Sequence, residues 1–312
     1  MSQLYLLFDV GGTDIKAGIS SAEGELLQIV REPTLKVAPE LAAESIINQL
    51  GALARTLGDS SGLQPAAAGL AVCGLVDAPA GLALYSANLG WRNAPLQNMA
   101  ADQLGMPVGF GHDVAMAAKA ELELGSGAAD ESLRRNSAVL IIGTGIASAL
   151  VVDGRMLNAG GCAGELGHTP VPAGLPCACG AIGCLETVAS AGAIARRYAE
   201  PGTAKVGAKE VFAARAAGDP KARQVIGEAV EALAFVLAQL CASTAPETII
   251  LGGGLAQAGP PFFAEVQAAL DQRLSFHRRP RLVPAQLGAD AGLRGAWLLA
   301  RQAAAKLEGQ GR

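Results

Sequence analysis

The sequence predicts an α/β fold built from two halves with a cleft between them, and two observations carry that prediction. Short apolar segments typical of strands alternate with longer amphipathic segments typical of helices. A strand, a glycine turn and a second strand occur twice, at Leu4–Ser20 and at Ala138–Gly154. A further feature concerns a site rather than the fold: the segment Gly164–Glu186 gathers three of the six cysteines and one of the three histidines. Paired glycine hairpins also occur in chains without an internal repeat.

The remaining elements follow from the spacing of apolar residues. Buried strands are expected at Ala67–Val72, Pro107–Phe110 and Thr248–Leu251. Helical spacing predicts helices at Pro39–Leu57, Val114–Leu124, Val188–Tyr198, Gln224–Ala242 and Ala291–Leu307. The helix at Gln224–Ala242 is long and mostly apolar, which fits either an ordinary core helix or a dimer surface.

The composition excludes several classes of protein. A chain of 312 residues with 51% hydrophobic and 17% charged residues can bury large cores and lacks the composition of a disordered chain. The net charge is −4 and the isoelectric point is about 5.5, without the basic stripe typical of nucleic-acid binders. Glycine, proline or charge interrupts the apolar runs before the roughly 20 residues that a membrane span needs. We therefore expect a cytoplasmic protein with neither nucleic acid nor membrane as a partner.

The cysteine-rich segment has the spacing of a metal site. Cys177, Cys179 and Cys184 form a C-x-C-x4-C pattern, and His168 precedes it by nine residues. One imidazole and three thiolates match the tetrahedral ligand set of structural Zn²⁺ and leave no open position for catalysis. The alternatives are disulfides, which an oxidising compartment would favour, or buried free thiols. The carboxylates of Glu165 and Glu186 lie just outside the metal ligands.

Three glycine-containing turns follow apolar strands and suit phosphate or nucleotide binding. The first is Asp9–Thr13, in which Gly11 and Gly12 let a ligand approach the backbone, Thr13 adds a hydroxyl, and Asp9 could hold Mg²⁺. The others are Gly143-Thr144-Gly145 and Gly252-Gly253-Gly254. Each alone is also an ordinary tight turn. None fits the Walker A spacing or a G-x-G-x-x-G motif that opens a helix.

Asp113 is the candidate general base. It follows a strand and begins a helix, so on local sequence alone it also reads as a helix N-cap. Phosphoryl transfer to a hydroxyl needs a positioned carboxylate of this kind. Together with the glycine turns, this position favours a catalytic role for Asp113 over that of a helix N-cap.

Taken together, these motifs make the chain similar to the ROK family of sugar kinases and sugar-responsive repressors, within the actin-like ATPase superfamily. The resemblance runs along the whole chain and rests on DVGGTDIK at 9–16, SANLGW at 86–91, IGTGIASALVVDGR at 142–155, AGELGH at 163–168, CACGAIGCLE at 177–186 and IILGGG at 249–254. It implies a two-lobed actin-like, ribonuclease H-like fold with an interlobe cleft and a structural zinc loop. We expect residues 1–118 plus 293–312 to form the smaller lobe and residues 119–292 the larger one.

The resemblance also implies roles for individual residues. The zinc ligands would be His168, Cys177, Cys179 and Cys184, and Asp113 would be the general base. ATP would contact Asp9, Gly11, Gly12, Thr13, Lys16, Gly143, Thr144, Gly145, Gly252, Gly253 and Gly254. The sugar would contact Asn88, His112, Asp113, Glu165, His168 and Glu186. His112 departs from the Asn-Asp-Ala-Asn usual in the family, which puts its sugar contact in question; a helix-start histidine without a ligand role is the alternative.

The expected activity is ATP-dependent phosphorylation of a hexose, with glucose converted to glucose 6-phosphate as the first choice. N-acetylmannosamine or N-acetylglucosamine comes next, and fructose third. A sugar-binding regulatory protein without kinase activity is the alternative from another class. A repressor would need a helix-turn-helix segment before the first hairpin, and we expect none because that hairpin begins at Leu4. The resemblance also implies a homodimer.

Overall fold

The computed structural model describes residues 3–61, 64–128, 130–172, 175–199 and 206–310, and it is a mixed α/β structure. The chain divides into two compact units. Unit 1 comprises Met1–Ala120, Ala159–Cys162 and Ala289–Arg312, and unit 2 comprises Glu121–Asn158 and Ala163–Gly288. Each unit has its own sheet and its own buried apolar cluster.

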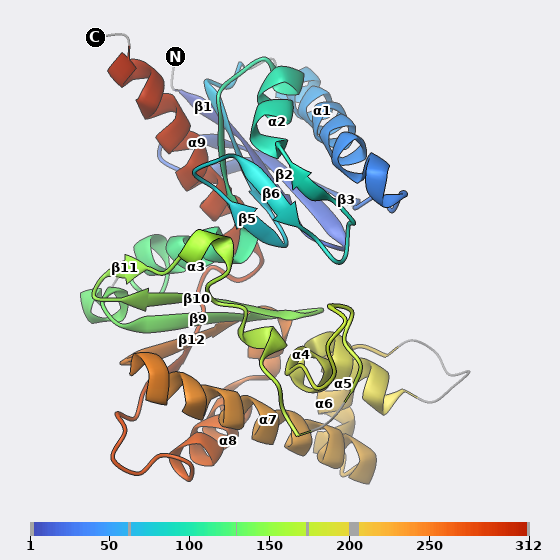
Figure 1. The fold of residues 1–312 in the computed structure, drawn as a ribbon, viewed down its shortest axis with the longest axis vertical. Helices are drawn as coiled ribbons and strands as arrows, with labels where there is room; N and C mark the ends of the chain where they lie inside the picture. Colours follow the sequence, from blue (N-terminus) through green and yellow to red (C-terminus); the bar gives the residue numbers. More distant parts are fainter. Residues whose placement is uncertain (1–2, 62–63, 129, 173–174, 200–205, 311–312) are drawn as a thin grey trace. The chain divides into compact units, whose positions relative to one another are not determined.

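The elements follow one another along the chain as coloured in Figure 1. The strands are β1 (Leu4–Val10), β2 (Asp14–Ser21), β3 (Leu26–Pro33), β4 (Ala67–Val72), β5 (Leu75–Asp77), β6 (Leu82–Tyr85), β7 (Arg92–Ala94), β8 (Val108–His112), β9 (Ser137–Ile142), β10 (Ile146–Val152), β11 (Arg155–Met156), β12 (Thr248–Gly252) and β13 (Arg281–Pro284). The α-helices are α1 (Ala42–Ser61), α2 (Leu96–Leu104), α3 (Asp113–Leu124), α4 (Glu186–Ala189), α5 (Ala191–Tyr198), α6 (Ala208–Ala216), α7 (Pro220–Thr244), α8 (Pro260–Asp271) and α9 (Ala291–Gln310).

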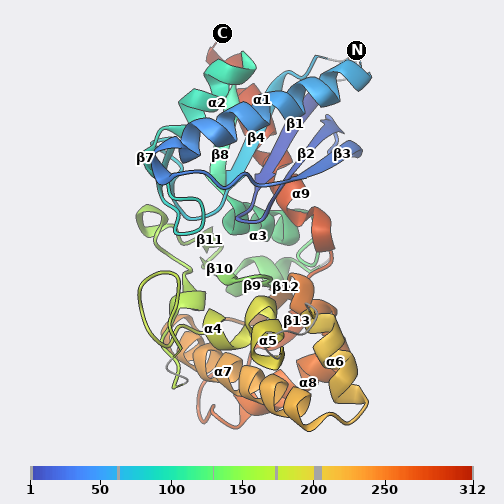
Figure 2. The same cartoon turned by 90° about the vertical axis from the view of Figure 1, so that its right-hand side faces the viewer.

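Unit 1 is built on a sheet with strand order β3-β2-β1-β4-β8. β1 pairs antiparallel with β2, which confirms the first predicted hairpin, whereas β1, β4 and β8 run parallel to one another. Successive side chains on a strand point to opposite faces. Leu70 of β4 belongs to the apolar cluster that includes α1, while its neighbour Gly69 meets α9. Helices α1 and α9 therefore cover opposite faces of this sheet, as Figure 2 shows.

Helix α9 lies unusually close to the strands beneath it. A Cβ atom at Gly69 would lie 1.8 Å from the carbonyl oxygen of Ala296, and one at Gly109 would lie 2.1 Å from that of Leu299. Real side chains do not reach such distances from a backbone atom, so both positions need glycine. The two glycines form a flat seat on β4 and β8 into which α9 packs.

Unit 2 is built on a sheet with strand order β11-β10-β9-β12-β13. The antiparallel pairing of β9 with β10 confirms the second predicted hairpin. Alternate residues of β9, such as Leu140 and Ile142, join an apolar cluster with α4 to α8 (Figure 1). α7 supplies many members of this cluster, which confirms its interpretation as a core helix. By length and composition alone α7 could cross a membrane, but most of its apolar stretch is buried in this core.

Glu121 is a fully buried carboxylate near the end of α3. Its Oε2 atom accepts hydrogen bonds from the backbone N–H of Ser126 at 3.2 Å, from the Ser126 hydroxyl at 3.2 Å and from the N–H of Gln286 at 3.1 Å. Its Oε1 atom accepts from the N–H of Leu287 at 2.5 Å. All these partners belong to unit 2. Glu121 therefore ties the segment before β9 to the segment after β13.

Two predicted elements differ from the structure. The helix expected at 188–198 is two helices, α4 and α5, because Ser190 adopts an extended backbone with φ −70° and ψ 154°. The Ser190 hydroxyl accepts the N–H of Ala193 and so begins a new helix. The strand expected to end at Phe110 continues through His112.

Candidate active site

Polar side chains follow three neighbouring parallel strands of unit 1. Asp9 lies near the end of β1, Cys73 follows β4, and Asp113 follows β8. Since β1, β4 and β8 are adjacent, these residues meet at one edge of the sheet. The carboxyl edge of parallel strands is where open α/β sheets bind ligands.

The first glycine turn, Gly11–Thr13, is held by a strap of residues 34–36. The Thr34 N–H donates to the carbonyl oxygen of Thr13 at 2.9 Å, and the Thr34 hydroxyl donates to that of Gly11 at 2.8 Å. The Lys36 ammonium donates to the Gly12 carbonyl. All three carbonyls of the turn are thus occupied. Among the described residues, the N–H groups of Gly12 and Thr13 have no protein acceptor, which leaves them available for an anion.

Asp9 is paired with Lys16 across the β1–β2 hairpin. The Lys16 ammonium lies 3.5 Å from Asp9 Oδ2 and donates to the Ala289 carbonyl at 2.8 Å. Burial, then the negative charge of Asp113, raise the pKa of Asp9 to about 6, against the opposing effect of Lys16. A Cβ at Gly292 would lie 2.1 Å from Asp9 Oδ2, so this carboxylate packs directly against the start of α9.

Asp113 is the first residue of α3, and His112 is the last of β8. Asp113 Oδ1 accepts the N–H of Val114 at 2.7 Å and lies 3.2 Å from His112 Nε2. The N–H of Ala115 donates to His112 Nδ1 at 3.2 Å. The imidazole of His112, rather than Asp113, thus receives the N–H of the third residue of the helix. Both side chains are 19% exposed.

Burial, and secondarily the charge of Asp113, raise the pKa of the neighbouring Cys73 thiol to about 12. Cys73 is therefore a neutral thiol at physiological pH.

Asn88 lies in the loop between β6 and β7. Buried Trp91 and Ser86 anchor this loop, because the N–H of Ser86 donates to the Trp91 carbonyl at 3.2 Å. The Asn88 carbonyl accepts from the Lys36 ammonium at 3.0 Å. A Cβ at Gly12 would lie 3.2 Å from the Asn88 Cβ, so the phosphate turn and Asn88 are in close contact. The exposed amide of Asn88 remains available to a ligand.

In unit 2, the other two glycine turns follow the adjacent parallel strands β9 and β12. The turn at 143–145 is closed by the N–H of Gly143, which donates to the Gly145 carbonyl at 2.9 Å, and the Ala191 N–H donates to the Gly143 carbonyl at 2.9 Å. Gly253 has φ +80°, and a Cβ there would lie 2.5 Å from the Ile142 carbonyl. The two turns are therefore neighbours.

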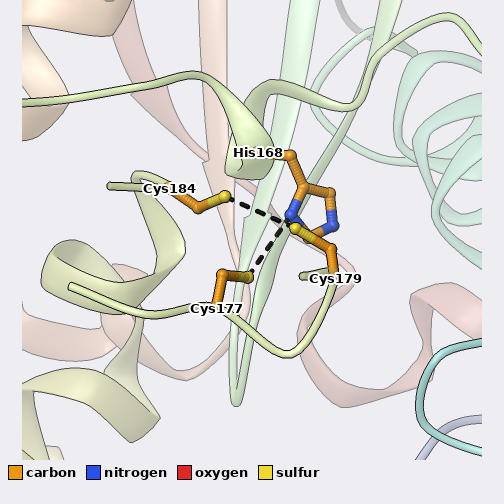
Figure 3. A group of neighbouring side chains, drawn as sticks. All are labelled: His168, Cys177, Cys179 and Cys184. Carbon is orange, nitrogen blue, oxygen red and sulfur yellow. Dashed lines mark hydrogen bonds between the residues drawn. The ribbon is translucent and has the colours of Figure 1, made fainter. Parts of the chain in front are cut away.

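The four predicted zinc ligands converge in unit 2. One ligand atom from each of His168, Cys177, Cys179 and Cys184 lies within 4.8 Å of the others, as Figure 3 shows. His168 Nδ1 is 3.7 Å from Cys177 Sγ, and the Sγ atoms of Cys179 and Cys184 are 3.6 Å apart. A tetrahedron with zinc–sulfur bonds of about 2.3 Å has edges of about 3.8 Å, so this donor set fits zinc. All six cysteines are free thiols, so the structure does not contain the disulfides that were the alternative to a metal site.

Glu165 and Glu186 flank this cluster. Glu165 Oε2 lies 3.9 Å from His168 Nε2, and Glu186 Oε1 lies 3.8 Å from His168 Nδ1. Glu186 Oε1 also accepts the Cys177 thiol at 3.1 Å, and its Oε2 accepts the N–H of Ile146 at 3.4 Å. Glu186 therefore joins the cysteine cluster to the turn at 143–145.

Sequence reasoning missed the strap residues Thr34 and Lys36. They lie in an irregular segment, and only the β2–β3 pairing brings them back to the glycine turn. No local pattern marks them.

Comparison with known proteins supports the resemblance inferred from the motifs. The sequence matches the description "ROK family" over residues 5–303. It is 32% identical to a glucokinase of Halalkalibacterium halodurans, covering 96% of this chain and 95% of that one. It is also 32% identical to an N-acetylmannosamine kinase of Escherichia coli, covering 95% and 98%.

Solved structures agree. A ROK family glucokinase from Streptomyces griseus, in complex with glucose and AMPPNP, superposes with a TM-score of 0.81 at 28% identity, covering 97% of this chain and all of that one. A ROK family transcriptional regulator superposes with a TM-score of 0.82 at 26% identity, covering 97% of this chain and 79% of that one. The mixed α/β fold is thus that of the ROK sugar kinases, of the actin-like ATPase kind. The chain belongs to the ROK family.

Proposed function

We propose that the protein is an ATP-dependent hexose kinase and that glucose is its substrate. The observation that carries this proposal is the carboxylate of Asp113 at the same sheet edge as a glycine turn whose carbonyls are tied back. The relatives named as glucokinases and the glucokinase structure with AMPPNP support it. In the reaction, the sugar hydroxyl oxygen, most simply the one on C6, bonds to the γ-phosphorus while the bond to the β-phosphate oxygen breaks. Asp113 accepts the hydroxyl proton, and ADP leaves.

The nucleotide contacts are part of the proposal. In unit 1, the N–H groups of Gly12 and Thr13 would bind phosphate oxygens, with Gly11 shaping the turn and Lys16 nearby. Asp9 would hold Mg²⁺, which supplies charge neutralisation on the phosphates. In unit 2, Gly143, Thr144 and Gly145 would bind phosphate, and Gly252, Gly253 and Gly254 would contact the adenosine. Units 1 and 2 would then be the two lobes of the kinase.

The sugar contacts are Asn88 in unit 1 and Glu165, His168 and Glu186 in unit 2, besides Asp113. Carboxylates and an amide accept and donate directional bonds to hydroxyl groups. A site built for a given hydroxyl rejects an analogue without it by about 10⁴–10⁵. N-acetylmannosamine, N-acetylglucosamine and fructose are the competing substrates; an N-acetylmannosamine kinase is 32% identical to this chain and an N-acetyl-D-glucosamine kinase 30% identical.

A coupled ADP-release assay with a panel of hexoses tests this function. We expect the highest kcat/KM with glucose. Sugar binding measured by calorimetry, without turnover on any hexose, would instead favour a regulatory protein. The TM-score of 0.82 to the ROK family transcriptional regulator supports this alternative.

We further propose that His168, Cys177, Cys179 and Cys184 bind a structural zinc ion. The donor set fits zinc by its separations. The ion takes no part in phosphoryl transfer and braces the loop between Glu165 and Glu186. Metal analysis should give one zinc per chain in the wild type and none in Cys184→Ala. Without zinc, we expect sugar binding to weaken more than nucleotide binding. Calorimetry of both substrates on the Cys184→Ala protein measures this difference, and Glu186, which also contacts the turn at 143–145, is the route by which nucleotide binding could change.

A homodimer in the cytoplasm completes the proposal. Cytoplasmic ATP as donor and six free thiols are consistent with that compartment. Light scattering coupled to gel filtration measures the mass, and a mass near 31.4 kDa would identify a monomer and contradict the dimer.

A further inference from the structure

The carbonyl groups held by the strap belong to the same peptide units as the two N–H groups available for an anion. The carbonyl oxygen of Gly11 accepts from the Thr34 hydroxyl at 2.8 Å, and the next N–H along the chain is that of Gly12. The carbonyl oxygen of Gly12 accepts from the Lys36 ammonium, and the next N–H is that of Thr13. In a planar trans peptide the C=O and N–H bonds point in opposite directions. A donor fixed on each carbonyl therefore aims the N–H of the same peptide away from that donor.

The same donors polarise these two peptide units. A hydrogen bond to a carbonyl oxygen makes the N–H of that peptide a stronger donor, because hydrogen bonds in a chain reinforce one another. An ammonium group has a larger effect than a hydroxyl because it carries a full charge. Lys36 thus makes the N–H of Thr13 the better of the two donors for an anion.

Lys36 makes a second hydrogen bond, to a segment outside the turn. Its ammonium also donates to the Asn88 carbonyl at 3.0 Å. The Asn88 side chain lies against the turn, since a Cβ on Gly12 would be 3.2 Å from the Asn88 Cβ and 3.4 Å from its Nδ2. Both segments belong to unit 1. One ammonium group therefore joins the turn proposed to bind phosphate to the loop proposed to bind the sugar.

The loop that carries Asn88 has other supports and does not depend on Lys36 for its fold. The N–H of Gly90 donates to the Ser86 carbonyl at 2.8 Å. Gly90 also packs against Pro39, because a Cβ there would lie 2.9 Å from the Pro39 Cα. Removing the ammonium of Lys36 should therefore shift Asn88 relative to the turn without unfolding the loop.

We propose that Lys36 is a positioning residue of the kinase, which aims the Thr13 N–H at a phosphate oxygen and sets the distance between that phosphate and the sugar held by Asn88. The inference rests on the proposed function and deepens it, because it assigns the relative placement of the two substrates to one side chain. Lys36 acts on both substrates through the backbone carbonyls of the turn and the loop. Since a misplacement of about 1 Å can lower a rate by about 10²-fold, this placement affects catalysis although Lys36 takes no part in the proton transfer.

Four variants separate the two hydrogen bonds of Lys36. Lys36→Met removes the ammonium and keeps the aliphatic part of the side chain, whereas Lys36→Arg keeps a charged donor. Thr34→Val removes the hydroxyl from the Gly11 carbonyl at similar volume, so it acts on the turn and not on Asn88. Lys306→Met is the matched control, because Lys306 is exposed on α9 in the same unit and its loss changes the net charge equally.

Calorimetry with glucose and with the ATP analogue AMPPNP measures both affinities without turnover. In Lys36→Met both dissociation constants should rise by about three- to tenfold, because water partly replaces the lost bonds of an exposed ammonium. The kcat of this variant should fall by about tenfold or more, and Lys36→Arg should recover most of each loss. Thr34→Val should weaken AMPPNP alone, and Lys306→Met should leave both constants within about twofold. A rise confined to AMPPNP in Lys36→Met, or no rise at all, would overturn the proposed link.

A double-mutant cycle tests whether Lys36 acts on the sugar through Asn88. Asn88→Ala removes the side chain proposed to contact the sugar but keeps the carbonyl that accepts from Lys36. In that background Lys36→Met should no longer weaken glucose binding, whereas its effect on AMPPNP should persist. An equal loss of glucose affinity in both backgrounds would overturn the proposal, because Lys36 would then contact the sugar itself or act through general stability.

The two proposals fail in different ways. A wild type that binds glucose and AMPPNP but phosphorylates no hexose would refute the proposed function, and the dissociation constants of the variants would still decide whether Lys36 links the two segments. An active wild type whose Lys36→Met variant keeps its affinities and its kcat would refute only the role of Lys36.

Discussion

Replacing Glu121 with glutamine should destabilise unit 2, and the hydrogen bonds set the size of the effect. The carboxylate accepts three hydrogen bonds on Oε2 and one on Oε1. Glutamine has one oxygen, and its best placement keeps that oxygen at the Oε2 position. Its NH₂ group then faces the N–H of Leu287, so two donors meet and one buried N–H loses its acceptor.

The cost of one orphaned buried donor is about 1–3 kcal/mol. The three retained bonds weaken because the acceptor is no longer charged. This loss is partly offset because burying a neutral amide costs less free energy than burying a carboxylate. We therefore expect the free energy of unfolding to fall by about 2 kcal/mol. With a denaturant slope of about 1–3 kcal/mol/M in urea, the midpoint should fall by roughly 1 M.

The location of the two tryptophans makes the assay specific. Trp91 and Trp297 both belong to unit 1, so their fluorescence reports that unit, whereas far-UV circular dichroism reports both. The Glu121→Gln shift should appear in circular dichroism and less in fluorescence. Glu123→Gln, an exposed position two residues along the same helix, is the control and should stay within about 0.5 kcal/mol of the wild type. Equal midpoints for the two variants would refute the role given to the buried bonds.

Three further predictions address the site and the packing of unit 1. Asp113→Asn should lower the rate of ADP release by about 10²–10⁴ while glucose affinity by calorimetry changes little; more than about a tenth of the wild-type rate would contradict its role as base. Because burial raises the pKa of Asp9 to about 6, the folded state favours the protonated acid, and the wild type loses stability as pH rises through that value. Asp9→Asn should therefore gain about 2–3 kcal/mol relative to the wild type between pH 4 and pH 8 in magnesium-free urea titrations; a difference independent of pH would contradict this. Gly69→Ala should cost about 2–3 kcal/mol, because its Cβ would meet a backbone oxygen at 1.8 Å. In Gly58→Ala the added Cβ would meet no atom within 4 Å outside the neighbouring residues and the backbone of its own helix, so this variant should stabilise α1 by about 0.5–1 kcal/mol. Tryptophan fluorescence in urea measures both variants, and equal shifts would exclude the close approach of α9 as the cause.

The parts of the site that depend on local pattern could be predicted from the sequence. The cysteine spacing put four ligand atoms together because a short loop leaves them few places to go. The two glycine hairpins formed because apolar alternation and a turn residue act within about fifteen residues. Asp113 was placed correctly at a strand end and helix start by the same kind of signal.

Long-range contacts could not be predicted. Lys36 reaches Gly12 and Asn88 only because β3 pairs with β2, and the residues around Lys36 have no pattern that predicts this contact. The hydrogen bond from the Ala115 N–H to His112 Nδ1 depends on the side-chain torsions of His112, which a sequence pattern does not specify. The break at Ser190 arose because a serine that caps a helix overrides a continuous apolar periodicity.

The seat of α9 has a consequence for synthesis of the chain. Unit 1 is covered on one face by a helix made only after all of unit 2. A growing chain therefore carries the sheet of unit 1 with that face bare for as long as unit 2 takes to be translated, a state in which exposed apolar strands invite association. At Gly69 and Gly109, that face has no side chain that another polypeptide could contact. The residues that let α9 approach so closely thus leave two positions of that bare face without a side chain.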